Sequence, residues 1–548
     1  RGDMKVLKNI MDRYGVKDGP PVKWQETPEW IDWDYAETKR ILSYARLRGL
    51  KVIAPALHNS GEVDVTFMNK FPDAKYFTTE WGGIYKLVFL NPADPLFIKY
   101  GADWVKEVVR LYGTDHYYEI GPYPELEVGN TPEEKVQIKT DYGKNTAEYI
   151  RTADPQGTWI MSGWGLADRF IWPEDVSRKF LTAIPDDVYI INDIWADYYH
   201  MYKRLNYFWG KNWGFSIIHF FGGNTSMRGD VPLTIKKAKE VASDPKAKNC
   251  VNFYINPEIN RHNFFYFDLC ATLAWDPENF NLDDFVKDYA LRRYGKQSAR
   301  NMEKCLKLLL GTVYSNYDQT PPLYEMALMY LNGSTPAGVV NRFKYIEPLQ
   351  ETLRIALGEG KYQKDNDRYF RDLVDLYRAF SLDLTNYYIY KLNDAFQSSD
   401  LEEFDKYSSL VNNLLDNLQN VYASHPDYRI QAEIDLAKSG NRPQRSEIPN
   451  EQDIRERYSA LASMKDYPAL LDYARNEKFE LLKYYYRKRL NLYIKTLRGQ
   501  ILKKSTEVPF ENVLKPEFKK ICEEWILYGG YPEKDVYPKS IIDTVAKA

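Results

Sequence analysis

Up to about residue 280, short runs of β-branched and aromatic residues alternate with longer amphipathic stretches. The runs with strand character cover residues 51–56, 116–121, 158–163, 188–193, 215–221 and 252–256. Residues 95–112 and 131–153 have the apolar spacing of amphipathic helices, and the second stretch opens with the helix-start sequence Thr-Pro-Glu-Glu. Strands that alternate with helices in this way predict βαβ units and a parallel sheet.

Beyond residue 280 the pattern changes to long helical periodicity. Apolar residues recur at three- and four-residue spacing, with charges between them, in 299–313, 345–357, 367–395, 401–423 and 468–503. We therefore expect a (β/α)8-type barrel over residues 1–280, incomplete at its N-terminus, followed by an all-α domain over residues 281–548.

The six strands fall two short of the eight that close a (β/α) barrel. The missing pair is expected before Arg1. Because an open sheet exposes two edges, which natural proteins pair or cover, we expect a companion chain to supply the missing strands. This chain would be either an N-terminal fragment left by processing or a distinct subunit.

Charge and cysteine content exclude several classes of function. The 74 basic and 77 acidic residues give a net charge of only -3, with no nucleic-acid footprint and no polybasic membrane patch. The longest apolar runs fall far short of the roughly 20 residues that span a bilayer. Four cysteines show neither CxxC nor Cys/His spacing, so no metal site is expected, and no organic cofactor is implied.

The remaining features of the composition concern the substrate, the growth temperature of the source organism and the location of the protein. Tyrosine, phenylalanine and tryptophan make up 15% of the chain. Aromatic faces pack against sugar rings, which fits an oligosaccharide or polysaccharide substrate, although most of these rings belong to the core. Abundant Lys, Glu and Tyr beside scarce Gln are typical of thermophiles. A soluble, secreted or processed protein is favoured.

Two glutamates are the leading catalytic candidates. Glu125 and Glu258 each follow a proline just beyond a strand-like run. Loops at the carboxyl ends of barrel strands converge on one face, so the two side chains can meet there. Glycosidases use a facing pair of carboxyl groups, one protonated and one ionised, as their catalytic groups. The alternative is that each is an ordinary solvated loop glutamate.

Several motifs together carry a family resemblance. They are Ile53-Ala-Pro-Ala56, Asn91-Pro-Ala-Asp-Pro-Leu-Phe97, Gly113-Thr-Asp-His116, Gly163-Trp164, Asp193, His219-Phe-Phe-Gly-Gly-Asn224, Pro257-Glu258, Arg292-Arg-Tyr-Gly295 and Leu471-Asp-Tyr-Ala474. In this order and spacing they resemble the family 89 glycoside hydrolases, the α-N-acetylglucosaminidases, from about residue 40 nearly to the end. The most specific part is the HxFGGN segment, followed about 34 residues later by Pro-Glu.

The resemblance implies roles for both glutamates. It makes Glu125 the general acid/base and Glu258 the nucleophile of a retaining mechanism, with carboxyl groups about 5–5.5 Å apart. Glu119 is the local competitor for the acid role. It ranks second because the family has a small residue at that position.

Other candidates for substrate binding lie at strand ends or match the family. They are Trp164, Asp193, Trp195, His219, Asn224 and Tyr473. The plain alternatives are a core tryptophan for Trp164, a helix N-cap for Asp193 and a buried, hydrogen-bonded histidine for His219. His58, Asn59 and Trp81 are weaker candidates, because the loop after Ala56 is longer than the family's.

One departure affects the substrate and leaves two function classes open. The family has Asn immediately before its acid/base, whereas this chain has Pro124, which offers neither a side-chain amide nor a backbone N–H. We expect a retaining exo-α-glycosidase for terminal α-linked (amino) sugars, with α-N-acetylglucosaminidase as the leading activity. The alternative is a non-catalytic carbohydrate-binding or assembly subunit that keeps the barrel.

Overall fold

The computed structural model of the protein describes most of the chain. It covers residues 3–16, 26–83, 85–123, 125–219, 227–257, 263–317, 322–326, 337–440, 442–459, 476–529 and 536–548. The chain forms two compact units. A sheet unit contains residues 1–218, 237–256 and 442–449, and a helical unit contains residues 219–236, 257–441 and 450–548.

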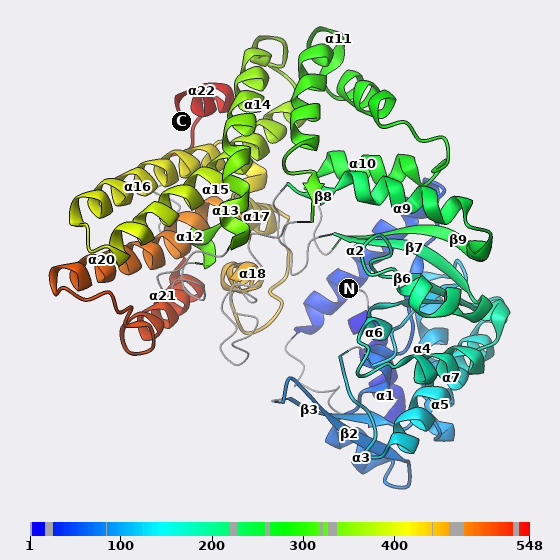
Figure 1. Ribbon diagram of the computed structural model, residues 1–548. Helices are drawn as coiled ribbons and strands as arrows, with labels where there is room; N and C mark the ends of the chain where they lie inside the picture. The colour runs from blue at the N-terminus through cyan, green and yellow to red at the C-terminus, as the bar shows by residue number, and fades with distance from the viewer. Residues whose placement is uncertain are drawn as a thin grey trace. The chain divides into compact units, whose positions relative to one another are not determined.

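A six-stranded sheet is the centre of the sheet unit (Figure 1). Its strands, in spatial order, are β1 (Ile53–Pro55), β4 (Tyr117–Glu119), β5 (Thr158–Ser162), β6 (Tyr189–Asp193), β7 (Asn212–His219) and β9 (Cys250–Pro257). The pairs from β1 to β7 are all parallel. All six strands lie where the sequence pattern predicts them, so the barrel-type fold is confirmed as a parallel half-barrel.

Helices cover the outer face of the sheet. They include α4 (Pro95–Tyr112), α5 (Pro132–Ala153) and α7 (Glu174–Ala183), which pack side by side (Figure 1). Each of the first two helices begins at a capping side chain: Asp94 accepts the Leu96 N–H at 2.8 Å, and Thr131 accepts the Glu134 N–H at 3.2 Å. Buried Trp159 on β5 packs its ring against Phe180 of α7, with centroids 6.3 Å apart.

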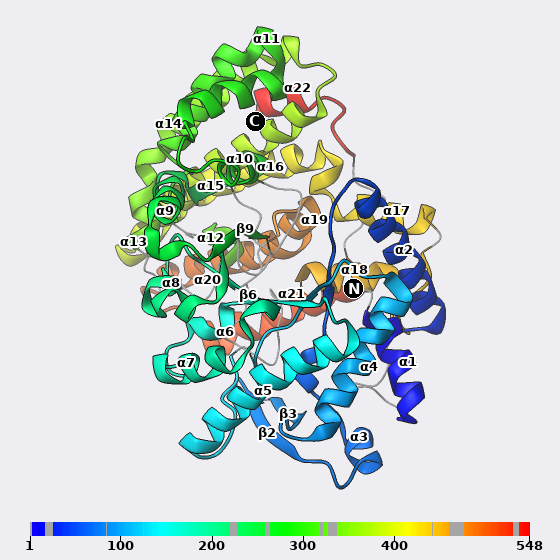
Figure 2. The same cartoon turned by 90° about the vertical axis from the view of Figure 1, so that its right-hand side faces the viewer.

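A β-hairpin that the sequence analysis does not predict lies before α4. It consists of β2 (Tyr76–Trp81) and β3 (Tyr85–Leu90), which are antiparallel. The shorter elements 3-10 helix η1 (His58–Gly61) and α3 (Val65–Lys70) precede it. The chain begins with α1 (Asp3–Tyr14) and α2 (Pro28–Leu47), and α1 packs beside α4 (Figure 2).

The helical unit is built on a long antiparallel helix pair. Helices α15 (Asp367–Gln397) and α16 (Leu401–Ala423) pack side by side, as both views show (Figures 1 and 2). Their positions confirm the helices predicted at 367–395 and 401–423. The other helices are α10 (Phe264–Leu273), α11 (Leu282–Leu310), α12 (Leu323–Met326), α13 (Ala337–Arg342), α14 (Ile346–Gly358), α17 (Ile430–Ser439), α18 (Asn450–Ser459), α19 (Phe479–Leu481), α20 (Arg487–Leu502), α21 (Lys515–Tyr528) and α22 (Ile541–Lys547).

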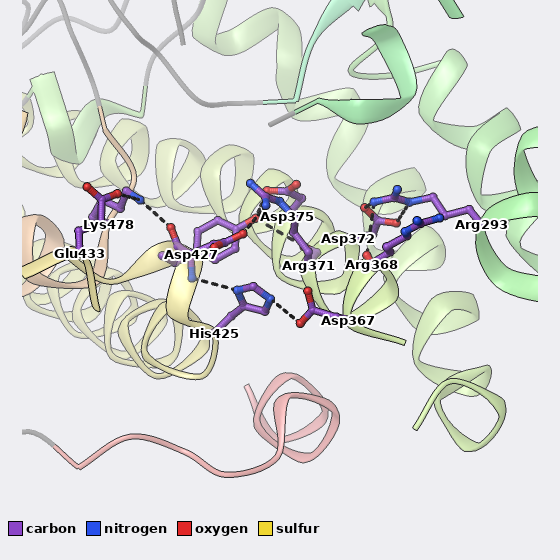
Figure 3. Close-up of polar contacts among 11 residues, drawn as sticks. Arg293, Asp367, Arg368, Arg371, Asp372, Asp375, His425, Asp427, Glu433 and Lys478 are labelled. Atoms are coloured by element: carbon purple, nitrogen blue, oxygen red, sulfur yellow. Dashed lines mark hydrogen bonds and ion pairs between the residues drawn. The ribbon is translucent and has the colours of Figure 1, made fainter. Parts of the chain in front are cut away.

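A series of polar contacts connects α15 to neighbouring segments (Figure 3). Arg293 of α11 donates two hydrogen bonds to the carboxylate of Asp372, at 2.5 and 2.6 Å. Arg371, one residue earlier on α15, forms an ion pair with Asp427. Lys478 donates to the backbone carbonyl of Asp427 at 2.6 Å. These contacts tie α11, α15 and the segment that begins at residue 476 into one body.

Candidate active site

The connection after β4 is held in place by side chains from three directions. The Ile120 carbonyl accepts the Trp159 indole N–H at 2.9 Å. The Gly121 carbonyl accepts the hydroxyls of Ser60, at 2.7 Å, and Tyr142, at 2.9 Å. Buried backbone carbonyls that are paired in this way resist local movement, so the start of the connection is fixed relative to the sheet.

Backbone strain in the same connection directs Glu125 outward. Tyr123 is fully buried, with its ring against those of Phe77, Phe89 and Tyr142. The φ angles of Tyr123 and Glu125 are +40° and +60°, in the left-handed region that costs a non-glycine residue roughly 1 kcal/mol or more. The buried tyrosine holds the chain in this conformation. Strain of this kind persists at sites where a side chain must be aimed.

Two indole N–H groups donate hydrogen bonds to the carboxylate of Glu125. The Trp164 Nε1–H donates to Oε1 at 2.9 Å, and the Trp81 Nε1–H donates to Oε2 at 3.1 Å. Trp164 begins α6 (Trp164–Ala167), directly after β5, and Trp81 ends β2. Because each oxygen has its own donor, rotation of the carboxyl group is restricted.

Trp81 is a site residue to which sequence reasoning gave little weight. Its signal was nevertheless present: Gly82 and Gly83, both with positive φ, separate Trp81 from the next β-rich run. A Gly-Gly pair between two such runs is typical of a hairpin turn. That the hairpin brings Trp81 to Glu125 depends on tertiary packing, which the local pattern does not contain.

Glu119, the competing acid, is partly buried at the end of β4. Its carboxyl has no hydrogen bond or ion pair within the described part of the chain. Burial raises its pKa above the ordinary value. Burial, and secondarily the charge of Glu119, raises the pKa of Tyr254 on β9 to about 12. Tyr254 therefore lies within electrostatic reach of Glu119.

Asp193 and Trp195 both occupy covered positions after β6. Asp193 is fully buried and accepts the Tyr202 N–H at 2.7 Å, in the first turn of α8 (Met201–Arg204). Burial raises the pKa of its carboxyl to about 7. The Trp195 ring is 7% exposed and stacks on Tyr198, with centroids 4.6 Å apart. In this geometry Asp193 accepts a hydrogen bond from the first turn of α8, and Trp195 packs against a neighbouring aromatic ring.

His219 is a buried histidine at the end of β7. Its Nε2 is hydrogen-bonded to the Asn263 side-chain amide, and its ring stacks on Tyr266 with centroids 4.4 Å apart. Asn263 in turn donates to the Arg228 carbonyl at 2.8 Å and accepts the Tyr314 hydroxyl at 2.6 Å. This network matches the buried, hydrogen-bonded histidine considered from the sequence. These hydrogen bonds fix the position of His219 at the end of β7.

Three predicted site residues, Glu258, Asn224 and Tyr473, lie outside the described residues, as does Pro124. The 5–5.5 Å carboxyl spacing therefore stays a prediction. Within the described ranges, no group of three or more His, Cys, Asp or Glu side chains is arranged to hold a metal ion. None of the described helices is both long and apolar enough to cross a bilayer.

A cavity of about 370 Å³ opens in the helical unit, among α10, α11 and α15. Its lining is aromatic and basic: Phe264, Phe267, Asp268, Tyr289, Arg292, Arg293 and Arg368. The carboxylate in this lining, Asp268, is paired with Arg292 at 2.9 Å. Because glycoside hydrolysis by the usual route needs two carboxyl groups, this lining does not provide a second candidate for the catalytic centre.

Comparison with known proteins identifies the family. The model of the α-N-acetylglucosaminidase TIM-barrel domain matches residues 20–277, and that of the α-N-acetylglucosaminidase C-terminal domain matches residues 285–541. Human α-N-acetylglucosaminidase is 24% identical over 513 residues, which cover 90% of this chain and 65% of the human protein.

Solved structures show the same fold. The family 89 glycoside hydrolase from Clostridium perfringens, in complex with PUGNAc, matches with a TM-score of 0.78 and 17% identity over 100% of this chain and 64% of its own. The Clostridium perfringens enzyme with two glutamates replaced by glutamine, in complex with its substrate GlcNAc-α-1,4-galactose, matches with a TM-score of 0.79 and 17% identity over 100% of this chain and 63% of its own. The chain thus spans slightly less than two thirds of the length of these relatives. Since the two family models together account for nearly all of it, the chain belongs to the family 89 glycoside hydrolases.

Proposed function

We propose that the protein is a retaining exo-α-glycosidase that removes terminal α-linked amino sugars from an oligosaccharide or polysaccharide. The observation that carries this proposal is the Glu125 carboxylate, exposed on a strained loop and held by two indole N–H groups. The name of the human relative and the substrate complex of the bacterial relative support an α-linked N-acetylglucosamine-type sugar as the leading substrate.

The proposed reaction has two steps. Glu125 gives its proton to the glycosidic oxygen while Glu258 attacks the anomeric carbon, so that the bond to the leaving group breaks and a glycosyl-enzyme forms. Glu125, now ionised, then removes a proton from water, whose oxygen displaces Glu258. The indole N–H groups of Trp81 and Trp164 stabilise the carboxylate that forms when Glu125 gives up its proton.

Substitution of each glutamate tests the assignment. Glu258→Gln removes the nucleophile's charge and should abolish turnover with the fold intact. Glu125→Gln should slow substrates with poor leaving groups most, because activated aryl leaving groups need little protonation. Proton NMR of the first product should show retained α-configuration. Near wild-type rates in both variants, or an inverted product, would contradict the proposal.

A non-catalytic carbohydrate-binding or assembly subunit remains the second candidate because of Pro124, which lacks the family's amide. A panel of aryl α- and β-glycosides separates the two functions. Binding of sugars without hydrolysis of any glycoside would favour the subunit. The companion chain expected to complete the barrel also stays a prediction.

A further inference from the structure

The inner face of the sheet carries a set of polar side chains that the proposed reaction does not use. Side chains alternate between the faces of a strand. Tyr118 is fully buried and donates to Asp154, which follows α5 on the outer face, at 2.7 Å. Glu119, the next residue, therefore faces inward. Pro55 of β1 and Ile160 of β5 flank it in register.

Two asparagines converge on the same inner face. A Cβ atom placed on Gly214 of β7 would lie 1.7 Å from the Asn252 Oδ1 and 2.4 Å from the Asn192 Oδ1. Both amides thus occupy the space that the absent side chain leaves free. Asn192 lies on β6, opposite Gly214, and is 1% exposed. Side-chain oxygens from β6 and β9 therefore meet beside the backbone of β7 on this face.

These oxygens lack donors within the described residues. The Oδ1 atoms of Asn192 and Asn252 are buried without a hydrogen-bond partner there, and the carboxyl of Glu119 has neither a hydrogen bond nor an ion pair there. Buried acceptors are normally paired, because leaving one unpaired costs about 1–3 kcal/mol. An amide can rotate to present its nitrogen, but an ionised carboxylate can only accept. The carboxylate of Glu119 therefore determines which class of ligand can bind: one that donates hydrogen bonds to it.

A cation is the partner that Glu119 lacks. Burial raises its pKa, and no positive charge in the described residues offsets that effect. Tyr254, which lies within electrostatic reach of Glu119, is a neutral phenol, since its pKa is raised to about 12. A ligand ammonium would supply the compensating charge and N–H donors to the carboxylate of Glu119.

The position of Glu119 connects this feature to the sugar site. It is the last residue of β4, and the connection that begins there carries Glu125. Ligands of barrel enzymes bind at this carboxyl end of the strands. In addition, Pro124 offers no amide to receive the carbonyl of an acetamido group.

We propose that Glu119 is a specificity-determining residue, whose carboxylate binds the free ammonium of a terminal α-linked 2-amino-2-deoxy sugar in preference to an acetamido group. This inference rests on the proposed function, and within its amino-sugar substrates it replaces the N-acetylated sugar as leading substrate with sugars that carry a free amino group.

Kinetics on three matched substrates test the proposal. We would measure kcat/KM for the 4-nitrophenyl α-glycosides of glucosamine, N-acetylglucosamine and glucose, with wild type, Glu119→Gln and Glu119→Ala. Wild type should prefer the glucosaminide by roughly tenfold or more. Glu119→Gln should lose roughly 100-fold on that substrate alone, since a desolvated charge pair is removed. Glu127→Gln is the matched control, because Glu127 lies on the same connection but is exposed.

Other outcomes would overturn the proposal. A Glu119→Gln variant that loses activity equally on all three substrates would show a structural role, and one that loses none would show no role. If wild type hydrolyses none of the three, the proposed function fails instead. Calorimetric binding of glucosamine, N-acetylglucosamine and glucose then tests Glu119 separately. A preference for glucosamine that disappears in Glu119→Gln supports the proposal, and equal binding by both proteins contradicts it.

Discussion

Glu125 accepts hydrogen bonds from two elements that are far apart in the sequence, the end of β2 and the start of α6. Each donor fixes one carboxylate oxygen, so losing one leaves the group free to turn about the other. Hydrogen bonds to a charged group contribute about 1.5–3 kcal/mol each. In the role that we propose for Glu125, proton donor to a glycosidic oxygen, catalysis depends on the orientation of the carboxyl group and should be sensitive to that loss.

Replacing either tryptophan by phenylalanine removes the N–H and keeps a ring. We expect Trp81→Phe and Trp164→Phe each to lower kcat for substrates with poor leaving groups by roughly tenfold or more, with a smaller effect on activated aryl glycosides. Steady-state kinetics on both substrate types would measure this. Trp275→Phe is the control, because Trp275 is 91% exposed. Equal losses on both substrate types would argue against a role through Glu125.

Asp193 gives a pH-dependent prediction at the same scale. Its pKa is raised from 3.8 to about 7, chiefly by burial, so the folded state holds this proton more tightly than the unfolded state does. The stability contributed by the protonated form is therefore fully present below about pH 4 and is lost as the pH rises through 7. In Asp193→Asn, which keeps an acceptor for the Tyr202 N–H, this dependence should disappear.

Thermal unfolding at pH 5 and pH 8 measures the effect. The melting temperature of Asp193→Asn, relative to wild type, should be higher at pH 8 than at pH 5. Asp187→Asn is the control, because Asp187 is exposed. A constant difference between the Asp193 variant and wild type would show that the carboxyl does not titrate in this window.

At the scale of elements, the sequence pattern located every strand of the main sheet and two of the three longest helices of the barrel region, α4 and α5 but not α2. Its success follows from burial: parallel strands covered by helices read as near-continuous apolar runs. The pattern did not locate the β2–β3 hairpin. That hairpin packs the rings of Phe77 and Phe89 against Tyr123, a residue far along the chain, and local periodicity does not contain such a contact. The domain boundary at residue 280 stays a prediction.

The junction between α11 and α15 permits a stability prediction. Asp372 pairs through both oxygens with Arg293, and their side chains are 17% and 11% exposed. Asp372→Ala leaves a largely buried guanidinium without its partner, which should lower the free energy of unfolding by about 3 kcal/mol. Asp405→Ala is the matched control. Its bidentate pair with Arg498 is over 40% exposed and should contribute at most about 1 kcal/mol.

Chemical denaturation of the three proteins, followed by circular dichroism, measures both effects. Comparable losses in the two variants would show that burial of the Arg293 pair adds nothing. In that case the contacts drawn in Figure 3 would contribute to geometry more than to stability.

At the scale of the whole molecule, the pattern of residues predicted the barrel type and two catalytic candidates, but not the side chains that the fold brings to them. Glu125 and Glu258 stood out from other loop glutamates because of their position after strands and because of the family resemblance. The donors to Glu125 come from β2 and α6, and the polar side chains on the inner face of the sheet come from β4, β6 and β9. No local signal assembles such a set, since it depends on how the sheet curves.

The last prediction concerns whether the sheet closes into a barrel in the active protein. In the described sheet, β1 and β9 are the two outer strands. In a closed barrel, strands beyond these six would pair with both of them, whichever polypeptide carries them. Hydrogen exchange can detect that pairing, because an amide bonded within a sheet exchanges far more slowly than one facing water. We expect β1 and β9 in the active protein to exchange about as slowly as β5 and β6. Fast exchange confined to the two outer strands, in material with full activity, would show that the enzyme works with an open sheet.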